Sequence, residues 1–352
     1  MTPLPPRGSV PWPVVPPVDQ DPTETRRPAG RLVPFLVIML VVAGSGAAGI
    51  LAATRSTIDS VVRIDGLAPV LAAPSANVDN YLLIGSDTRA GADPTAPDFG
   101  GIGSEADVGG SRSDTLMVLR HDTVTGEVAL LSIPRDLWVE IPGRGKNRIN
   151  SAYRDGPAAV VQTVQANLGI PVHHYVEVDF SGFKSLVDAI GGVEMCFDLP
   201  TRDVNTGLNV PLPGCVVLDG VQALAYARSR HYQEFYDGDW HEDGTADLGR
   251  IERQQFFVQT ALKGALNGLL HDPFRAGDVV RSGVGSVSVD DELDLIETAA
   301  VLRPAAAGAL RTFSLPVVGK KIDGKAVLLL GDGAEGLLAY FRGDAPSPPP
   351  AG

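Results

Sequence analysis

The apolar positions of this chain form short runs whose period switches between that of a strand and that of a helix. Tyr81–Asp87, Thr115–Arg120 and Glu127–Ile133 are apolar or alternating segments bounded by turn residues, which predicts strands. Pro157–Leu168 has helical spacing and stops before Gly169, a residue that often follows a helix end. The first half of the chain therefore predicts strands followed by a helix.

The second half continues this alternation. Further strands are predicted at His174–Asp179, Val193–Leu199, Leu310–Pro316 and Lys325–Leu330, and further helices at Phe183–Ile190, Asp219–Arg228, Leu248–Leu270, Asp290–Leu302 and Ala334–Phe341. Asp219 and Asp247 are the expected N-caps of two of these helices. The irregular, acidic and aromatic stretch His231–Thr245 is predicted to be a mobile loop. Strands interleaved with helices predict an α/β fold with a central mixed β-sheet flanked by helices on both faces.

One apolar run is long enough to cross a bilayer. Leu32–Thr54 contains 23 residues without a charge, and about 20 apolar residues span the hydrocarbon core. Four arginines precede it, so the positive-inside rule predicts a single-pass cell-membrane protein with a cytoplasmic N-terminus. A cleaved signal peptide is the alternative, but the segment before the run is long and no strong small-x-small cleavage site ends it.

The same composition shifts divide the chain into regions. With 44% hydrophobic residues, most of it is expected to fold. We expect a disordered proline-rich cytoplasmic tail at 1–31, a transmembrane helix at 32–54, a connector at 55–79, a folded extracellular domain at 80–343 and a disordered tail at 344–352.

Charge and cysteine content narrow the classes of function. The net charge of −13 and the pI of about 4.9 leave no basic stripe, which excludes nucleic acid as a partner. Arginine outnumbers lysine by 23 to 6, a bias that a GC-rich genome would produce, so only the position of an arginine carries functional weight. Outside the membrane, Cys196 and Cys215 predict a disulfide, and two buried unpaired thiols are the alternative.

Four arginines fall within 26 residues: Arg228, Arg230, Arg250 and Arg253. Guanidinium groups bind phosphate oxygens through parallel N–H donors, so their clustering on an acidic chain predicts an anion site. Arg250, Arg253 and Gln254 share the first turns of a predicted helix, where backbone N–H groups also favour anions. A solvated helix face, and cations placed at a helix C-terminus, are the alternatives for these residues.

Two aspartates suggest a metal beside these cations. Asp87 ends one predicted strand, and Asp114 precedes the next, within the sequence Arg112-Ser-Asp-Thr. Two carboxylates brought together suit Mg²⁺, although each alone is more often a turn or capping residue. Arg135 follows a strand and a proline, and its alternative is a salt bridge to Asp136.

In unbroken order over about residues 80–265, these segments resemble the LytR-CpsA-Psr family. The motifs that carry the resemblance are Leu82-Leu-Ile-Gly-Ser-Asp87, Arg112-Ser-Asp-Thr-Leu-Met117, Leu131-Ser-Ile-Pro-Arg-Asp136, Arg148-Ile-Asn-Ser-Ala-Tyr153, His174-Tyr-Val-Glu-Val-Asp-Phe-Ser-Gly-Phe183, Leu186-Val-Asp-Ala-Ile-Gly-Gly-Val193, Leu218-Asp-Gly-Val-Gln-Ala-Leu-Ala-Tyr-Ala-Arg-Ser-Arg230 and Arg250-Ile-Glu-Arg-Gln-Gln255. The long segment between Asp87 and Arg112 and the enlarged acidic segment between Arg230 and Arg250 depart from the family pattern.

The resemblance implies a membrane-anchored phosphotransferase that moves a glycopolymer from a polyprenyl-pyrophosphate lipid to a muramic acid hydroxyl of peptidoglycan. It assigns Mg²⁺ or Mn²⁺ to Asp87 and Asp114. It assigns the pyrophosphate to Arg112, Arg135, Arg228, Arg230, Arg250 and Gln254, with Arg112, Arg135 and the two aspartates acting in catalysis. The cysteine pair resembles that of actinobacterial members, which makes arabinogalactan a candidate cargo.

The partners implied are the lipid-linked glycopolymer, the peptidoglycan acceptor and the membrane bilayer. An apolar cavity for the lipid is expected among the helices at 157–168, 183–190 and 256–270. Two other functions stay open at this point: a pyrophosphatase that releases the lipid without transfer, and a non-catalytic lipid-binding or regulatory protein of the envelope.

Overall fold

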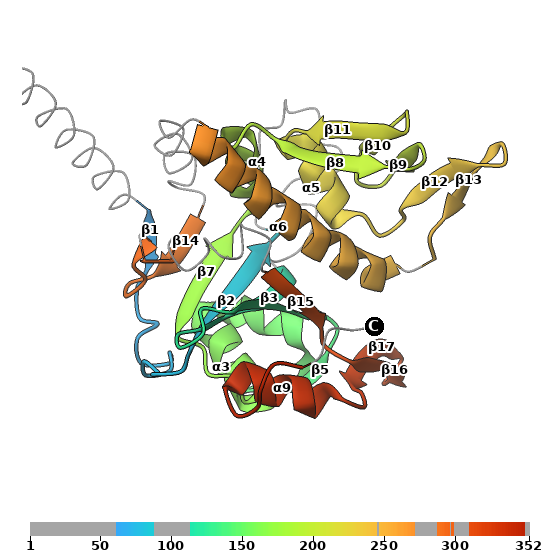
Figure 1. Ribbon diagram of the computed structural model, residues 1–352. Helices are drawn as coiled ribbons and strands as arrows, with labels where there is room; N and C mark the ends of the chain where they lie inside the picture. Colours follow the sequence, from blue (N-terminus) through green and yellow to red (C-terminus); the bar gives the residue numbers. More distant parts are fainter. Residues whose placement is uncertain are drawn as a thin grey trace, which may run out of the picture. The chain divides into compact units, whose positions relative to one another are not determined.

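A seven-stranded mixed sheet forms the centre of the described part of the chain in this computed structural model, which comprises residues 61–87, 113–244, 246–271, 287–295, 297–298 and 310–348 (Figure 1). In order across the sheet, its strands are β1 (Val62–Ile64), β14 (Val287–Asp290), β7 (His174–Val178), β2 (Val78–Ser86), β3 (Ser113–Asp122), β4 (Val128–Ile133) and β15 (Leu310–Ser314). The pairs β1–β14, β7–β2 and β4–β15 are parallel, and the other three are antiparallel.

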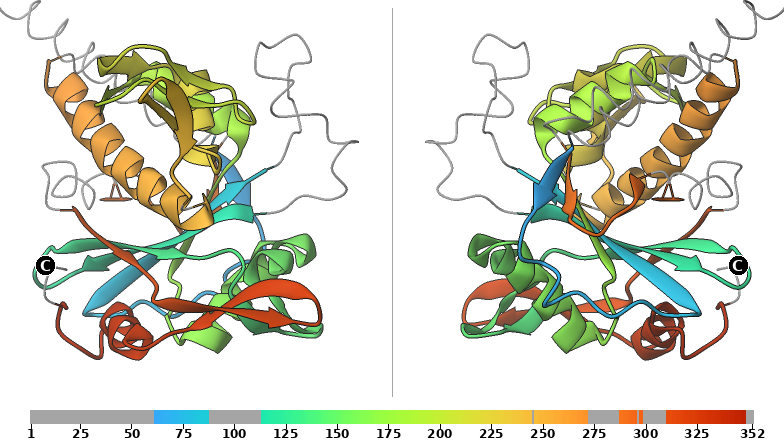
Figure 2. Two further views of the ribbon diagram at one scale, coloured as in Figure 1. Left: turned by 90° about the vertical axis from the view of Figure 1, so that its right-hand side faces the viewer. Right: turned by 90° about the vertical axis from the view of Figure 1, so that its left-hand side faces the viewer.

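Helices cover both faces of this sheet, as the sequence predicts (Figure 2). On one face, α3 (Pro157–Leu168) and α9 (Ala334–Arg342) pack on the buried side chains of Leu82, Val118 and Leu131. On the other face, α6 (Ala246–His271) places Val258 against a cluster that includes Met117, Leu119 and Leu130. Successive side chains of a strand point to opposite faces, so the uninterrupted apolar runs of the central strands supply both cores.

Local capping chemistry sets most helix ends. Gly169 ends α3 with φ of 68°, and the carboxylate of Asp219 accepts a hydrogen bond from the Gln222 N–H at the start of α5 (Gly220–Arg228). Helix α4 (Phe180–Ala189) begins three residues before the predicted start, because Asp179 caps it. Helix α6 begins at Ala246, so Asp247 lies inside the helix and the prediction that it is the N-cap is wrong.

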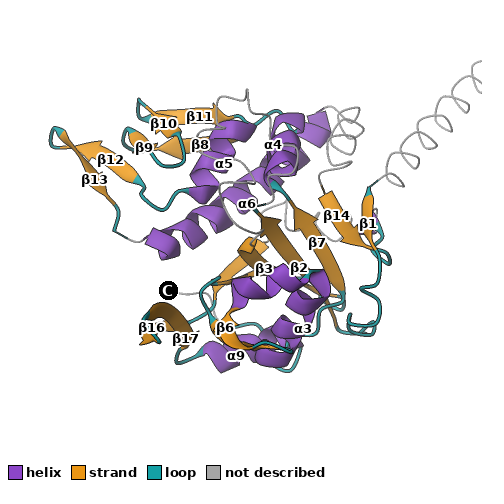
Figure 3. Ribbon diagram, turned by 180° about the vertical axis from the view of Figure 1, so that it is seen from behind, coloured by secondary structure: helices purple, strands orange, loops and turns teal. Residues whose placement is uncertain are grey.

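A second group of elements lies on the α6 side of the sheet (Figure 3). There α4 and α5 pack with the pair β8 (Val193–Phe197) and β11 (Gly214–Leu218). A four-stranded sheet joins β10 (Leu208–Val210), β9 (Thr201–Asp203), β12 (Gln233–Tyr236) and β13 (Asp239–Glu242) in that order.

The prediction of a loop at His231–Thr245 is therefore wrong over most of its length. Strands β12 and β13 form a hairpin, and its turn is Asp237-Gly238, with positive φ at both residues (53° and 84°). A two-residue Asp-Gly turn of this kind matches the twist of the flanking strands.

Cys196 and Cys215 are register partners on β8 and β11, with Cα atoms 3.9 Å apart and sulfur atoms at disulfide distance. The register is also constrained at Gly192, just before β8. Its φ is 86°, and an added Cβ would lie 2.8 Å from the carbonyl oxygen of Leu218. A side chain at position 192 would therefore push the two strands apart.

The remaining elements are β5 (Trp138–Ile141), β6 (Gly145–Arg148), η2 (Ile149–Asp155), β16 (Val317–Ile322) and β17 (Lys325–Leu330). Strands β16 and β17 form a second hairpin around Asp323-Gly324, again with both φ angles positive. The leucine N–H of Leu328 donates to the carbonyl of Asp136, which fastens this hairpin to the loop after β4.

Three other boundaries differ from expectation. Strand β1 lies inside the predicted connector 55–79, and β14 occupies the start of the predicted helix Asp290–Leu302 and the three residues before it. Within the predicted tail 344–352, the Ser347 hydroxyl donates to the Glu127 carboxylate, so the described part of that tail packs on the domain. In the described residues we find no helix of sufficient length and apolarity for a membrane span, and Leu32–Thr54 lies outside them.

Candidate active site

A cavity of about 480 Å³ lies between the C-terminal ends of β2 and β7, the start of β3, and helices α4, α5 and α6. Its apolar wall includes Leu83, Met117, Phe180, Phe183, Leu224, Phe257 and Val258. Helices α4 and α6 thus line an apolar cavity as expected from the sequence. Helix α3 does not, because its buried side chains belong to the core on the opposite face of the sheet.

The polar wall of this cavity brings together four arginines from three separate segments. Arg135 follows β4, Arg228 ends α5, Arg230 follows two residues later, and Arg250 lies in the first two turns of α6. The guanidinium of Arg228 lies 4.6 Å above the ring of Phe180, at the junction of the polar and apolar walls. Arg250 is only 4% exposed, so its charge faces the protein and the cavity more than bulk water. The cavity therefore has one cationic wall and one apolar wall.

Gln254 lies in the same wall, but its amide N–H groups already have protein partners. They donate to the Thr115 hydroxyl at 2.9 Å and to the Ala227 carbonyl at 3.0 Å. These contacts tie α6 to β3 and to α5. A direct bond from this amide to phosphate would have to replace one of them, so the geometry gives Gln254 a positioning role in addition to its place in the wall.

Arg253 is oriented away from the cavity and does not line it. Its two terminal nitrogens donate to the Asp243 carboxylate at 2.6 Å and to the Ser229 carbonyl at 2.8 Å. Its guanidinium also lies 4.7 Å above the Tyr232 ring. Arg253 therefore ties both ends of the segment that carries the β12–β13 hairpin to α6.

Asp203 holds the same segment from the other side, and no sequence motif pointed to it. One carboxylate oxygen accepts hydrogen bonds from the Ser229 hydroxyl and from the N–H groups of Arg230 and His231, at 2.7, 3.1 and 3.0 Å. Burial alone would raise the pKa of Asp203, but these bonds outweigh it and hold the pKa below its ordinary value. The carboxylate thus stays charged and fixes the chain at Arg230.

Asp179 also lines the cavity, next to the apolar wall. Burial raises the pKa of this carboxyl group above its ordinary value, although the N–H groups of Gly182 and Ser181 donate to it. Since those bonds cap α4, Asp179 serves the helix start.

The predicted metal ligands fall at the open end of the β2–β3 pair. Asp87 follows β2 directly and is half-buried, and Asp114 lies on β3, where a β-bulge interrupts the register between Gly85 and Ser86. The side chain of Asp114 and all of Arg112 lie outside the described residues. The register nevertheless places both aspartates at neighbouring strand ends.

Two serines at the same place support a polar ligand there. Ser86 and Ser113 are register partners with no exposed surface, and among the described residues neither hydroxyl has a hydrogen-bond partner. Buried hydroxyl groups normally find a partner. The Asp87 carboxylate and two buried hydroxyls are hard-oxygen donors of the kind that suits Mg²⁺, which keeps several waters and shares its ligands with substrate phosphates.

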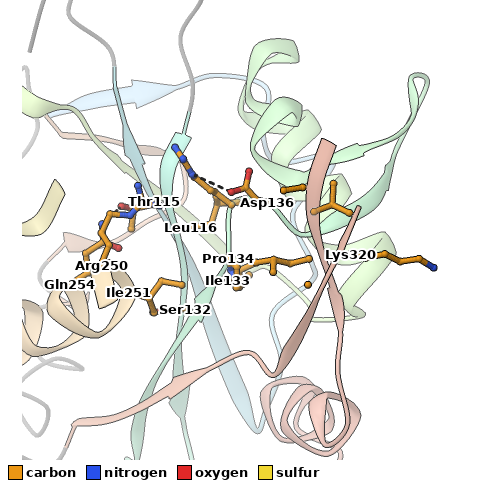
Figure 4. A pocket seen from close by; sticks show the side chains of 15 residues that line it. Thr115, Leu116, Ser132, Ile133, Pro134, Asp136, Arg250, Ile251, Gln254 and Lys320 are labelled. Carbon is orange, nitrogen blue, oxygen red and sulfur yellow. Dashed lines mark hydrogen bonds and ion pairs between the residues drawn. The ribbon is translucent and has the colours of Figure 1, made fainter. Parts of the chain in front are cut away.

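A second cavity, of about 250 Å³, adjoins the first, and Thr115, Arg135, Arg250 and Gln254 line both. Figure 4 shows Thr115, Gln254 and Arg250 together at one end and Lys320 at the other, with its side chain pointing away. The Asp136 carboxylate lies between two cations, 3.7 Å from Arg135 Nε and 3.2 Å from Arg148 Nε. The salt bridge considered as an alternative for Arg135 is thus present, and Arg135 still lines both cavities.

Comparison with known proteins gives one consistent relationship. Residues 56–334 match the model of the LytR_cpsA_psr family. The chain is 36% identical over 267 residues to the probable cell wall biosynthesis protein LcpB of Corynebacterium glutamicum, covering 75% of this chain and 61% of LcpB. It is 31% identical over 260 residues to TagU of Oceanobacillus iheyensis, named a polyisoprenyl-teichoic acid–peptidoglycan teichoic acid transferase, covering 72% of this chain and 71% of TagU.

Among solved structures, the chain resembles a LytR-Csp2A-Psr enzyme from Actinomyces oris with a TM-score of 0.59 and 25% identity. That similarity covers 80% of this chain and 95% of the other. The two proteins therefore share the mixed sheet with helices on both faces.

Proposed function

Because this chain belongs to the LytR_cpsA_psr family, we propose that it transfers a cell-wall glycopolymer, with its phosphate, from a polyprenyl-pyrophosphate lipid to peptidoglycan. The observation that carries the proposal is the two-sided cavity, in which Arg135, Arg228, Arg230 and Arg250 face an apolar wall. A pyrophosphate joined to a hydrocarbon chain has the same division, with an anionic group next to an apolar one. TagU, which is named for the transfer of teichoic acid to peptidoglycan, supports the same class of reaction.

In the proposed reaction, a hydroxyl oxygen of the acceptor attacks the sugar-side phosphorus. A new O–P bond forms, the P–O bond to the bridging oxygen breaks, and polyprenyl phosphate leaves with the electron pair of that bond. The hydroxyl proton passes to a carboxylate of the site. The arginines stabilise the negative charge that spreads over the phosphoryl oxygens and the leaving phosphate, which is the main contribution a protein makes to this chemistry.

Asp87 and Asp114 would hold Mg²⁺ or Mn²⁺, with Ser86 and Ser113 nearby, and the ion would supply further neutralisation of the pyrophosphate. This chain's own residues account for the remaining binding. Arg228 can contact a phosphate at the edge of the Phe180 ring, so the first apolar contact of the lipid follows its phosphate directly. Arg230 is placed by the contacts of Asp203.

We propose the matching location for the whole chain. Leu32–Thr54 would anchor it in the cell membrane by a single pass, with the N-terminus cytoplasmic and the described residues outside. In that oxidising location, the neighbouring Cys196 and Cys215 would form a disulfide. Arabinogalactan stays a candidate cargo, implied by the resemblance of the cysteine pair to actinobacterial relatives.

The decisive experiment mixes the full chain in detergent micelles with a polyprenyl-pyrophosphate oligosaccharide, peptidoglycan and Mg²⁺. We expect equal amounts of free polyprenyl phosphate and of peptidoglycan-linked phosphosugar. Arg228→Ala should lower turnover roughly 10²-fold or more, since removal of one preorganised donor to a developing oxyanion costs about that much. The control is Arg154→Ala, an exposed arginine of η2 that lines neither cavity.

The two other functions give different products in the same experiment. Free polyprenyl phosphate without a peptidoglycan product would identify a pyrophosphatase. An intact donor, with lipid affinity unchanged in Asp114→Ala, would identify a non-catalytic binding protein. Equal loss of turnover in Arg154→Ala and Arg228→Ala would remove the cavity from the mechanism.

A further inference from the structure

The smaller cavity has no role in the reaction so far, although it shares its inner wall with the larger one. We propose that this cavity, together with the β16–β17 hairpin, is the binding site for the acceptor. The cavity would bind one amino-sugar ring of a peptidoglycan chain. The acidic stem peptide of the same peptidoglycan chain would lie along the lysines of the hairpin. The inference rests on the proposed transferase function and adds the location of the second substrate.

The direction of the reaction leads to this assignment. In phosphoryl transfer the attacking and leaving oxygens lie roughly in line on opposite sides of phosphorus. The apolar wall of the larger cavity takes the leaving lipid phosphate, and the phosphorus lies at the shared residues, among them Arg135 and Arg250. The attacking hydroxyl must therefore arrive from the side opposite the lipid. The smaller cavity reaches these arginines without passing through the lipid wall.

The size and lining of the smaller cavity fit a sugar ring. Its volume of about 250 Å³ is below the usual range for drug-sized ligands, which suits a single ring rather than a chain. Ile133, Pro134 and Leu328 give it an apolar side, against which the C–H face of a sugar can lie. The Asp136 carboxylate, whose side chain is 20% exposed, supplies an acceptor for a sugar hydroxyl. Asp136 would orient the ring and is a positioning residue.

The charge of the hairpin matches an acidic acceptor. The chain has only six lysines, and three of them, Lys320, Lys321 and Lys325, lie on this hairpin with a single acid, Asp323. On a protein of net charge −13, that makes the hairpin locally cationic, and Lys320 places one of these charges at the rim of the cavity. Stem peptides of peptidoglycan carry carboxylates, so opposite charges would meet there, which favours encounter and orientation.

The hairpin is also held firmly enough to form a preformed wall. The Leu328 N–H donates to the Asp136 carbonyl at 3.0 Å, and Arg148 donates to the Ala326 carbonyl at 2.7 Å. Arg148 therefore links the hairpin to the Asp136 carboxylate, which it also contacts. Arg148 thus positions both the Asp136 carboxylate, which would accept a hydrogen bond from the sugar hydroxyl, and the neighbouring hairpin that carries the lysines.

Gly319 allows the cavity to be filled without disturbing the fold. It lines the cavity, its φ is not in the left-handed region, and an added Cβ would meet no atom within 4 Å. Gly319→Trp should therefore fold and occupy the space of the sugar ring. The matched control is Val318→Trp, one residue away on the opposite face of the same strand, where the side chain is 53% exposed and does not line the cavity.

Two measurements on the full chain test the inference: affinity for a soluble disaccharide-peptide fragment of peptidoglycan, and affinity for the lipid-linked donor. We expect Gly319→Trp to weaken fragment binding roughly tenfold or more, because the indole would occupy the space of the sugar ring and remove its contacts with the cavity. Donor affinity should stay within about twofold of the wild type. Lys320→Glu should weaken binding of the fragment and spare a peptide-free sugar, and Val318→Trp should change neither affinity.

Unchanged fragment affinity in Gly319→Trp would overturn the inference. So would an equal loss of donor affinity, which would assign the cavity to the donor glycan. These results are distinct from failure of the proposed function, in which the wild-type chain forms no peptidoglycan-linked product when donor, peptidoglycan and Mg²⁺ are all present. Failure of the wild type to bind the fragment, with the donor still consumed, would point to hydrolysis and would overturn the acceptor site as well.

Discussion

Asp203 is the residue whose replacement tests the architecture of the site most directly. Its two carboxylate oxygens both accept hydrogen bonds. One accepts from the N–H groups of Asn205 and Thr206. The other accepts from the Ser229 hydroxyl and the N–H groups of Arg230 and His231. In Asp203→Asn, an NH₂ group replaces one oxygen, so either orientation of the amide leaves two backbone N–H groups facing a donor.

The size of the effect follows from these contacts. A buried donor that loses its acceptor costs about 1–3 kcal/mol, and Asp203 has no exposed surface. Two such donors, with some relaxation of the chain, predict a loss of about 3 kcal/mol in the free energy of unfolding. In the orientation that places the new NH₂ group against the N–H of Arg230, affinity for the pyrophosphate donor should fall as well.

The assay is urea unfolding of the full chain in micelles, followed by near-ultraviolet circular dichroism, with Asp198→Asn as control. Asp198 is exposed, and its replacement by asparagine is the same chemical change. The free energy of unfolding of Asp198→Asn should therefore stay within about 0.5 kcal/mol of the wild type. The pH dependence gives a second check. The folded pKa of Asp203 lies below the ordinary 3.8, so the stability from its charge is complete above that pH and is lost as pH falls through the folded pKa.

The difference in stability between wild type and Asp203→Asn should therefore shrink at acid pH. A loss below about 1 kcal/mol at neutral pH would refute the reasoning, since it would mean that the chain repartners both N–H groups at little cost. A loss just as large in Asp198→Asn would refute it too, because the effect would then reflect removal of negative charge in general.

Three further predictions follow from the same contacts. Arg253→Ala should lower the free energy of unfolding by about 3 kcal/mol, because the Asp243 carboxylate and the Ser229 carbonyl lose the hydrogen bonds that Arg253 donates. Arg228→Ala, by contrast, should leave the melting temperature nearly unchanged. If Arg253→Ala were as stable as the wild type, Arg253 would again be a candidate substrate ligand. Joint replacement of Cys196 and Cys215 by serine should cost about 3 kcal/mol, measured by denaturation against the oxidised wild type, and two free thiols in the mature protein would contradict the proposed disulfide. Burial lowers the pKa of His174, but its contacts with the Asp290 and Asp79 carboxylates outweigh burial and raise it. This stabilisation is complete below pH 6.5 and is lost as pH rises through the folded pKa. Amide protection factors in β14, which correct for the intrinsic rise of exchange with pH, should therefore fall over that range in the wild type and not in His174→Gln.

The sequence predicted those features whose cause is local. Apolar runs such as Tyr81–Asp87 correctly predicted the central strands. Asp219 and Gly169 correctly predicted helix ends, because a helix cap depends on only a few neighbouring residues. Arg135, Arg228, Arg230 and Arg250 do gather in one cavity, as the motif order implied.

The missed hairpin had a local signal that other features obscured. Asp237-Gly238 is a turn sequence, but the strands beside it are only four residues each and carry charges, so their alternation was weak. Asp323-Gly324 gives the same signal between the strands of the second hairpin.

The role of Asp203 had no signal of this kind. The partners through which it fixes the chain at Arg230 are 26 to 28 residues away, and only the paired strands bring them together. The distinct roles of Arg250 and Arg253 also depend on tertiary contacts, because both residues are cations on one helix and differ only in what packs against them.

The register between β8 and β11 has a consequence for the arginines that lies beyond the strands themselves. Leu218 ends β11, Asp219 caps α5, and Arg228 is the last residue of that helix. A slip of one residue in β11 would delay the helix start and rotate each of its side chains by about 100°. Gly192 and the Cys196–Cys215 pair, which constrain this register, thus also help to set the orientation of the Arg228 guanidinium at the far end of α5.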